Sequence, residues 1–137
     1  MKKIGVVFLS LFLVLPLINC QNKRAPGKTG ALNSVYFDYD QSLIRADSAT
    51  ILQGNASYLK GNQGMSTVEG HCDERGSNEY NIALGQRRAD SSRSYLINLG
   101  TDAGSLKTLS YGEEKPVCHE QSESCWWKNR RADFRKQ

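Results

Sequence analysis

The chain has 137 residues and a formal net charge of +4, from 18 basic and 14 acidic side chains. This length suits one compact domain. Charges of both signs are interspersed rather than grouped, so nothing in the composition points to a nucleic-acid partner.

The first 19 residues have the pattern of a secretory signal peptide. Two lysines precede an apolar run, residues 4–18, which is too short to span a bilayer comfortably. The run ends in LPLINC, and a cysteine directly after it, with Leu17 three positions earlier, resembles a bacterial lipobox. Asn19 departs from that pattern, which usually has Gly, Ala or Ser there. We expect Cys20 to be acylated and to become the mature N-terminus, with an ordinary signal peptide as the alternative.

The mature chain divides into a linker and a single domain. Removal of residues 1–19 leaves 137 − 19 = 118 residues, enough for one domain with a hydrophobic core and too few for two. Residues 20–34 hold almost no large apolar side chain and are rich in Gly, Lys and Asn. We therefore expect the lipidated N-terminus and a flexible linker there, followed by the domain over residues 35–137.

The domain opens with a strand and a helix. The segment VYFDYD, residues 35–40, has the two-residue period of a strand with one buried face. Asp47 or Ser48 can cap the helix that follows, and GNQG at residues 61–64 ends it. Its apolar side chains recur at helical spacing: Ile51, Leu52, Tyr58 and Leu59.

A second strand and the longest helix come next. MSTVEGH, residues 65–71, is strand-like, and Ser77 or Asn78 begins a helix that Gly100 ends. One stripe of this helix carries Gly85, Ala89, Ser92, Leu96 and Leu99. Because small residues lead the stripe, we expect the helix to lie close to a sheet near its N-terminal end.

Two more strands complete the pattern. LKTLSYG at residues 106–112 predicts a third strand, and RADFR at residues 131–135 predicts a short last strand after the segment CWWKNRR. Strands alternate with helices in one small domain without repeats. This order predicts a two-layer α/β sandwich.

The most distinctive segment is TVEGHCDERGSNEYNIALGQRRAD, residues 67–90, which gathers charged side chains and a histidine around two glycines after a strand-like run. Such a composition is typical of a site at a strand's end. Together with VYFDYD, LSYGEEKP and KNRRADF, the segment resembles the OmpA-like peptidoglycan-binding domains over residues 35–134. Within that family it resembles most closely the peptidoglycan-associated lipoproteins (Pal). The most specific part is G-H-x-D-x-x-G followed by Y-N-x-x-L-x-x-x-R-A.

The resemblance implies a β-α-β-α-β-β domain whose helices pack on a small mixed sheet. It implies a non-catalytic module, without cofactor or metal, that binds the diaminopimelate of peptidoglycan stem peptides while the lipid on Cys20 holds the outer membrane. It also implies a Tol-Pal system, serving envelope integrity and cell division, with TolB as a partner. An OmpA-like lipoprotein outside that system is the alternative. Gln21 is not the Asp that retains many lipoproteins in the inner membrane, which favours the outer membrane.

Diaminopimelate presents an ammonium and a carboxylate on one carbon, so its receptor needs a fixed acceptor and a fixed donor fork. We expect Asp73, just past the second strand, to accept from the ammonium. We expect Arg88, on the following helix, to bind the carboxylate bidentately, helped by backbone N–H groups near Asn78. The resemblance adds further contacts: Tyr39, Asp40, Arg75, Asn81 and Leu84.

Less specific roles remain open for several of these side chains. Asp73 and Arg88 could form only a structural ion pair between loop and helix, and Asn81 could only satisfy backbone groups. We expect His71 to orient the loop through hydrogen bonds. The pair Arg130–Arg131 resembles a terminal arginine pair of the family, and it either stiffens the site from behind or lies on a solvated face.

The cysteines allow three interpretations. A cysteine nucleophile with a histidine base would make the protein an enzyme, but Cys72 and His71 are adjacent, and adjacent strand residues point to opposite faces. Zinc ligation by Cys118, His119 and Cys125 is a second interpretation. In an oxidising periplasm, two cysteines seven residues apart in a polar loop more naturally form a disulfide. We therefore expect a Cys118–Cys125 bridge and a lone Cys72 thiol without a role.

Trp126 and Trp127 could stack on a sugar ring of a glycan ligand. We expect instead that one indole packs against the sheet and that the other stays partly exposed. No residue in the sequence identifies a contact with TolB independently of the resemblance.

Overall fold

A computed structural model describes residues 31–137. The expected signal peptide, the acylation of Cys20 and the linker as far as residue 30 lie outside these described residues. Over residues 31–137, no helix combines the length and the apolar character that crossing a membrane requires.

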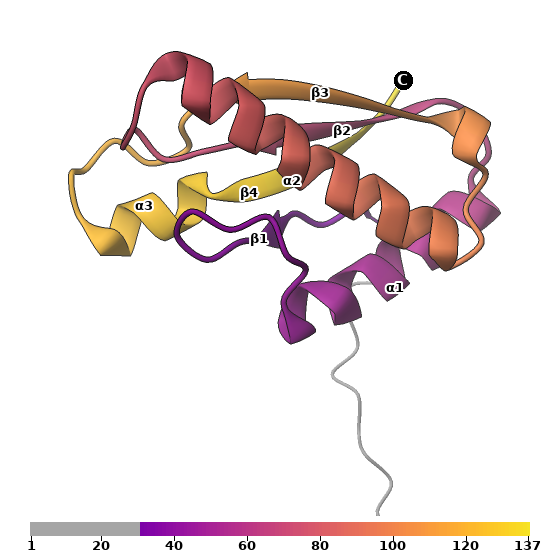
Figure 1. Cartoon of the computed structure of the whole chain (residues 1–137). Helices are drawn as coiled ribbons and strands as arrows, with labels where there is room; N and C mark the ends of the chain where they lie inside the picture. The colour runs from indigo at the N-terminus through magenta and orange to yellow at the C-terminus, as the bar shows by residue number, and fades with distance from the viewer. Residues whose placement is uncertain (1–30) are drawn as a thin grey trace, which may run out of the picture.

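Four strands form one mixed sheet, and the two long helices lie on one side of it (Figure 1). The elements are β1 (Val35–Tyr36), α1 (Ala46–Gly61), β2 (Ser66–His71), α2 (Asn78–Asn98), η1 (Ala103–Ser105), β3 (Leu106–Gly112), α3 (Glu123–Asn129) and β4 (Arg131–Lys136). The strand order is β1-β4-β2-β3, with β4 antiparallel to both neighbours and β2 parallel to β3. The two layers confirm the predicted α/β sandwich.

The hydrophobic core fills the space between the sheet and the helices α1 and α2. Its buried side chains are Val35, Phe37, Leu52, Ala56, Leu59, Val68, Ala89, Leu96, Leu106, Ala132 and Phe134. The stripe predicted on α2 faces this core, with only its last member partly exposed: Gly85, Ala89, Ser92, Leu96 and Leu99. The helical spacing therefore predicted the correct face of α2.

Two glycines let α2 approach the sheet closely. A Cβ atom on Gly70 of β2 would lie 1.8 Å from the carbonyl oxygen of Gly85 on α2. A Cβ atom on Gly85 would lie 2.3 Å from Oγ of Ser110 on β3. Only glycine fits this contact without displacing its neighbours. The small residues of the stripe predicted this approach, which fixes the first turns of α2 beside the end of β2.

The first strand is shorter than expected. β1 covers only Val35–Tyr36, although Phe37 is still buried in the core. Beyond Phe37 the chain turns, and Asp40 has a φ of 55°, a conformation that Asp tolerates better than most residues. The alternation over residues 35–40 therefore continues past the end of the strand into a turn.

Neither expected cap begins helix α1. The carboxylate of Asp47 lies in the first turn and accepts hydrogen bonds from the guanidinium of Arg45. The hydroxyl of Ser48 is buried and donates to the carbonyl of Tyr36 at 2.9 Å, which ties α1 to β1. The expected capping of α1 by Asp47 or Ser48 is therefore wrong, while the helix ends at GNQG as predicted.

Two further segments differ from the expectation. Helix α3 occupies most of CWWKNRR, a segment too short to show helical periodicity in the sequence. At the other end, Leu32 packs against the core and Asn33 exchanges hydrogen bonds with the side chain of Asn55. Leu32 and Asn33, which belong to the expected linker, therefore contact the domain.

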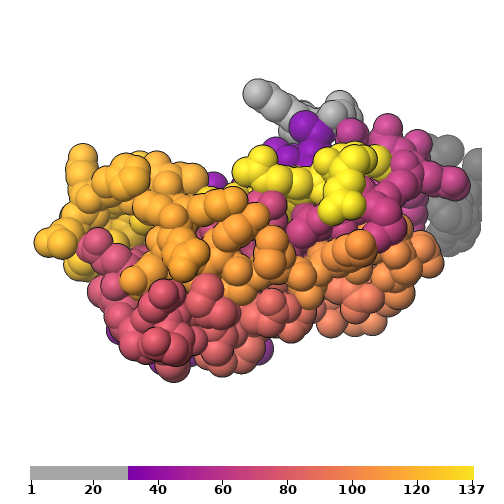
Figure 2. All heavy atoms as spheres, turned by 90° about the horizontal axis from the view of Figure 1, so that it is seen from above, coloured from indigo at the N-terminus to yellow at the C-terminus, as the bar shows by residue number. Residues whose placement is uncertain are grey.

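The side of the sheet opposite α1 and α2 carries no helix of the described chain. Seen from above, atoms of β2, β3 and β4 lie at this surface (Figure 2). Alternate side chains of β2 and β4 gather here, among them Glu69, His71 and Asp133.

Candidate functional site

A crevice of about 280 Å³ opens beside the end of β2, where the charged segment predicted a site. It is lined by Tyr39, Asp40, Cys72, Asp73, Arg75, Gly76, Tyr80, Asn81, Leu84, Arg88 and Arg130. All seven side chains predicted to contact a ligand are among these residues. The fold therefore brings them together around one cavity.

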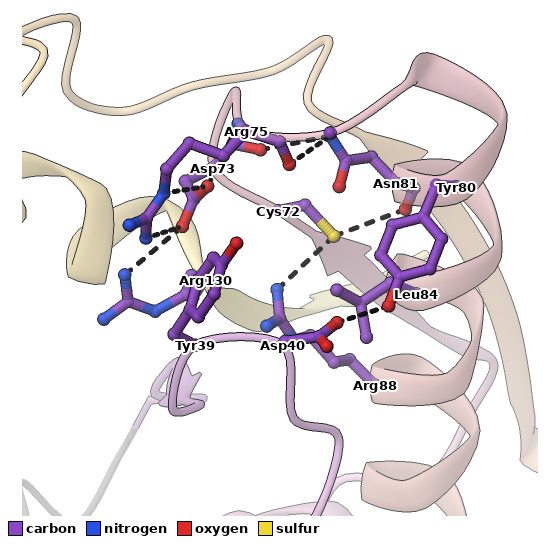
Figure 3. A pocket seen from close by; sticks show the side chains of 11 residues that line it. Tyr39, Asp40, Cys72, Asp73, Arg75, Tyr80, Asn81, Leu84, Arg88 and Arg130 are labelled. Carbon is purple, nitrogen blue, oxygen red and sulfur yellow. Dashed lines mark hydrogen bonds and ion pairs between the residues drawn. The ribbon is translucent and has the colours of Figure 1, made fainter.

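Three segments form most of the crevice, and Arg130, between α3 and β4, completes it (Figure 3). The turn after β1 carries Tyr39 and Asp40, the loop after β2 carries Asp73 and Arg75, and one face of α2 carries the lining residues within 80–88. Because the glycine contact fixes α2 against β2, it also sets how far the loop lies from the helix.

Arg88 is a buried cation held by backbone carbonyls. Its side chain lines the crevice but is otherwise surrounded by protein, with the residue 1% exposed. The guanidinium donates to the carbonyls of Gln41 at 2.8 Å, His71 at 2.9 Å and Asp38 at 3.2 Å. A guanidinium has five N–H groups, so two remain for other acceptors, and Nη1 lies 3.3 Å from the weakly accepting sulfur of Cys72.

Within residues 31–137 Arg88 forms no ion pair, and the charges of Asp73 and Asp40 attract it only from a longer distance. Burial lowers the pKa of Arg88, but arginine side chains remain charged in proteins. A buried charge without a counter-ion is costly. The arrangement therefore favours the binding of an anion in the crevice.

Asp73 is paired with two other arginines. Its carboxylate accepts from Nε of Arg75 at 3.0 Å, from Nη2 of Arg75 at 2.7 Å and from Nη1 of Arg130 at 3.2 Å. Burial by itself would raise the pKa of Asp73, but these hydrogen bonds lower it overall, so the carboxylate is charged at neutral pH. The alternative of a structural ion pair between Asp73 and Arg88 is therefore wrong.

Arg75 is enclosed by aromatic rings and acids. Its guanidinium carbon lies 4.1 Å from the ring centroids of both Tyr39 and Trp126, and Nη2 lies 3.5 Å from the carboxylate of Glu123. The hydrogen bond to Asp73 raises the pKa of Arg75. These contacts give Arg75 a positioning role, because they hold the Asp73 carboxylate in place. Its direct contact with a ligand stays a prediction.

Asn81 and Leu84 form the wall on the side of α2. The buried amide of Asn81 donates to the carbonyl of Asp73 at 3.3 Å, to the carbonyl of Arg75 at 3.2 Å and to the carboxylate of Glu113. Asn81 thus satisfies backbone groups of the loop, which was the alternative role considered for it, and it also lines the crevice. Leu84 is buried and supplies the apolar part of the wall.

The rim of the crevice includes a tyrosine that the sequence analysis missed. The hydroxyl of Tyr80 donates to the carboxylate of Asp40, which links α2 to the turn after β1 and raises the pKa of the phenol. Tyr80, Leu84 and Arg88 follow at intervals of four along α2, so they lie on one row of the helix. That spacing was the signal that could have identified Tyr80.

Arg130 stiffens the site from behind. It is buried and donates to the carbonyl of Phe37 at 3.1 Å as well as to Asp73. Arg131 is also buried, but it lies on the other side of the sheet and bonds to Asp133 at 3.0 Å. The alternative of a solvated arginine pair is therefore wrong for both residues.

His71 and Cys72 point to opposite faces, so they cannot act as base and nucleophile. Cys72 lines the crevice, its thiol donates to the carbonyl of Asn81 at 3.3 Å, and burial raises the pKa of the thiol to about 11. The imidazole of His71 stacks on Tyr111 instead and forms no hydrogen bond within the described chain. We expected His71 to orient the loop through hydrogen bonds; its ring makes none with the described residues, and only its backbone carbonyl takes part, accepting from Arg88.

Cys118 and Cys125 form a disulfide, the pairing expected from the sequence, with their Cα atoms 5.3 Å apart. Their sulfur atoms are therefore not free to bind zinc together with His119. The bridge closes the loop that leads into α3.

The two tryptophans agree only partly with the expectation. Trp127 is 42% exposed and meets the Tyr36 ring of β1 edge-on. Trp126 does not pack against the sheet; it stacks on Arg75 and its indole N–H donates to Glu74 at 3.1 Å. Its position beside the crevice, behind Arg75, was not predicted.

Comparison with known proteins places this fold and crevice in a family. The sequence pattern described as the OmpA family matches residues 36–130. The chain belongs to the OmpA family. Its OmpA-family relatives include the peptidoglycan-associated lipoprotein of Brucella melitensis, 37% identical over 148 residues that cover 92% of this chain and 88% of the relative. The protein of the same name from Haemophilus influenzae is 50% identical over 101 residues, covering 73% of this chain and 66% of the relative.

Solved structures of other proteins have the same fold. The crystal structure of the peptidoglycan-associated lipoprotein from Burkholderia pseudomallei superposes with a TM-score of 0.73 at 43% identity, covering 76% of this chain and 89% of that chain. The C-terminal domain of Helicobacter pylori MotB gives a TM-score of 0.72 at 20% identity, covering 78% of this chain and 85% of that chain, which shows the fold alone. The family and the likeness to Pal proteins are those predicted from the sequence, and membership of this family agrees with the prediction that the chain is not an enzyme.

Proposed function

We propose that the chain binds peptidoglycan non-covalently by holding the diaminopimelate residue of the stem peptides in the crevice. The observation that carries this proposal is Arg88, a buried cation that no carboxylate of the described chain neutralises. A ligand carboxylate that enters the crevice supplies the missing counter-ion. The names of the relatives as peptidoglycan-associated lipoproteins support the cell wall as the source of that ligand.

The ammonium of diaminopimelate needs an acceptor near the guanidinium. Asp73 already accepts four hydrogen bonds, from the backbone N–H and side chain of Arg75 and from Arg130. These fill the lone pairs of a carboxylate. Asp40 lines the same crevice and, among the described residues, accepts only from the hydroxyl of Tyr80. In our proposal the ammonium therefore lies near Asp73 and donates hydrogen bonds to the free lone pairs of the Asp40 carboxylate.

We further infer that the lipid on Cys20 anchors the chain in the outer membrane and that the chain tethers this membrane to the wall. The LPLINC segment, Gln21 and the word lipoprotein in the names of the relatives support this part. A place in a Tol-Pal system, with TolB as a partner, belongs to the proposal and rests on the resemblance to Pal proteins.

Titration calorimetry with a soluble stem peptide that contains diaminopimelate tests the crevice. Arg88→Lys keeps the charge but loses the donor fork, so its affinity should fall at least about tenfold, almost as far as that of Arg88→Ala. Arg87→Lys is the matched control, because Arg87 is exposed and lies about 100° around the helix from Arg88. Its affinity should match the wild type.

The ligand provides a second comparison. Peptides with an amidated diaminopimelate carboxylate, or with lysine in its place, should bind more weakly than the natural peptide because they lack the anion for Arg88. Circular dichroism of each variant separates weak binding from loss of the fold. Equal affinities for the lysine and diaminopimelate peptides would rule out this use of the crevice.

A further inference from the structure

A second polar cluster lies on the side of the sheet that carries no helix of the described chain, the side seen in Figure 2. Glu69 of β2 and Asp133 of β4 are directly opposite in the antiparallel register, and His71 lies two residues along β2. One possible ligand atom from each of the three lies within 4.8 Å of the others. Two like charges opposite one another destabilise a sheet unless a positive group binds beside them.

Glu69 and Asp133 are paired with arginines, but the imidazole of His71 has no hydrogen-bond partner within the described chain. It is 1% exposed, and neither ring nitrogen has a hydrogen-bond partner in residues 31–137. Nε2 lies 3.5 Å from Oδ2 of Asp133, which is long for a hydrogen bond. A neutral imidazole has one ring nitrogen with a free lone pair, which a metal ion can take. A buried polar group without a partner is costly, and native structures rarely leave one.

We propose that Glu69, His71 and Asp133 form a binding site for a divalent transition metal ion, with Zn²⁺ as the probe. One neutral imidazole and two carboxylates are ligands that zinc accepts, at about 2.0–2.2 Å from the ion. Ligand atoms already within 4.8 Å of one another reach that arrangement through side-chain movements of about 1 Å. The site is separate from the crevice, because Cys72 and His71 point to opposite sides of the sheet.

Basic side chains around the cluster compete with a metal ion. Nε of Arg135 lies 2.7 Å from Glu69, and Nε of Arg131 lies 3.0 Å from Asp133. Lys115 adds a third positive charge near the imidazole. The Arg135 side chain is 68% exposed and can turn into solvent when the ion takes Glu69, whereas Arg131 is buried. The strength of zinc binding therefore depends mainly on Arg135.

Calorimetric titration of the purified protein with zinc chloride tests the site. One zinc ion should bind per chain, and zinc should raise the melting temperature. Glu69→Gln and His71→Gln should each weaken binding by at least about tenfold. His119→Gln is the matched control, because His119 is the other histidine of the chain and is exposed on the loop before α3. Its affinity for zinc should be unchanged.

Arg135→Gln distinguishes a metal site from a set of ion pairs. At a metal site, removal of the competing cation strengthens zinc binding; in a set of ion pairs it only lowers stability, and no heat of zinc binding appears. Asp133→Asn provides the same test as His71→Gln if the histidine variant does not fold. The proposal is overturned if the wild type binds no zinc, or if a folded Glu69→Gln or Asp133→Asn variant binds zinc as tightly as the wild type.

Discussion

The guanidinium of Arg88 has its orientation set before any ligand arrives. Carbonyls of Asp38 and Gln41 in the turn after β1, and of His71 at the end of β2, hold it from two directions. In the proposed binding mode, a ligand carboxylate meets a donor fork that is already ordered, which reduces the entropy lost on binding. Because carbonyls of the turn hold Arg88, the affinity for a ligand carboxylate should also depend on the conformation of the turn.

Gly70 has no side chain, and this allows α2, which carries Arg88, to lie against β2. Gly70→Ala would place a Cβ atom 1.8 Å from a backbone oxygen of α2. Because both groups are fixed to the backbone, no side-chain rotation can relieve this clash. We expect a loss of about 1–3 kcal/mol in the free energy of unfolding, measured by urea denaturation. Gly54→Ala is the control: this exposed position in α1 has no neighbouring atom within 4 Å, so the substitution should stabilise by about 0.5–1 kcal/mol. Equal effects of the two substitutions would show that α2 can move away from β2 freely.

For single residues, the sequence predicts which side chains lie in the site better than it predicts their hydrogen-bond and ion-pair partners. The position of Asp73 after a strand and of Arg88 on the next helix was enough to place both beside one cavity. The sequence could not show that Arg75 and Arg130 already bind Asp73, because Arg130 lies 57 residues away and only the pairing of β4 with β1 and β2 brings it there. For the same reason, it could not show that Arg88 forms no ion pair with an acidic side chain of residues 31–137.

Helix α3 braces the crevice without lining it. Its Trp126 stacks on Arg75, and its Glu123 pairs with Arg130, so α3 supports both arginines that hold the buried carboxylate. A helix of seven residues has little stability of its own. The bridge Cys118–Cys125 closes the preceding loop and ends within the helix, which keeps α3 in this position.

Loss of this disulfide should weaken both the fold and the site. The double substitution Cys118→Ser with Cys125→Ser should lower the free energy of unfolding by about 2–3 kcal/mol, because so short a loop is then free in the unfolded chain. Stem-peptide affinity should also fall, by a smaller factor than in Arg88→Ala, since α3 no longer holds Arg75 firmly. Urea denaturation and calorimetry measure the two effects, and dithiothreitol should reproduce them in the wild type while leaving the double variant unchanged. Lower stability with full affinity would mean that α3 does not brace the site.

The elements differ in how much of them the sequence reveals. Helix α2 has 21 residues and a clear apolar stripe, so both its existence and its buried face were predictable. Helix α3 has too few residues to repeat a pattern, and its position depends on a disulfide and on contacts with distant arginines. In β1 the alternation is real, but the sheet ends after two residues because the chain turns near Asp40.

At the scale of the whole molecule, the proposed tether has two ends joined by a short segment. Leu32 is the first residue that packs against the core, and 32 − 20 = 12 residues separate it from Cys20. A fully extended chain covers at most about 3.5 Å per residue, so the domain stays within roughly 40 Å of a membrane that holds the lipid. Under this proposal, the crevice can bind only peptidoglycan that lies close to this membrane.

The two ends of the tether should be separable by single substitutions. A Cys20→Ser chain should leave the membrane fraction, because it lacks the acyl chains that anchor it, and should still sediment with purified peptidoglycan sacculi. An Arg88→Ala chain should stay in the outer-membrane fraction and sediment with sacculi at least about tenfold less than the wild type, since its crevice has lost the cation that a carboxylate needs. Arg87→Lys should behave as the wild type in both assays. Membrane retention of Cys20→Ser would contradict the lipid anchor, whereas undiminished sedimentation of Arg88→Ala would mean that another surface of the domain binds the wall.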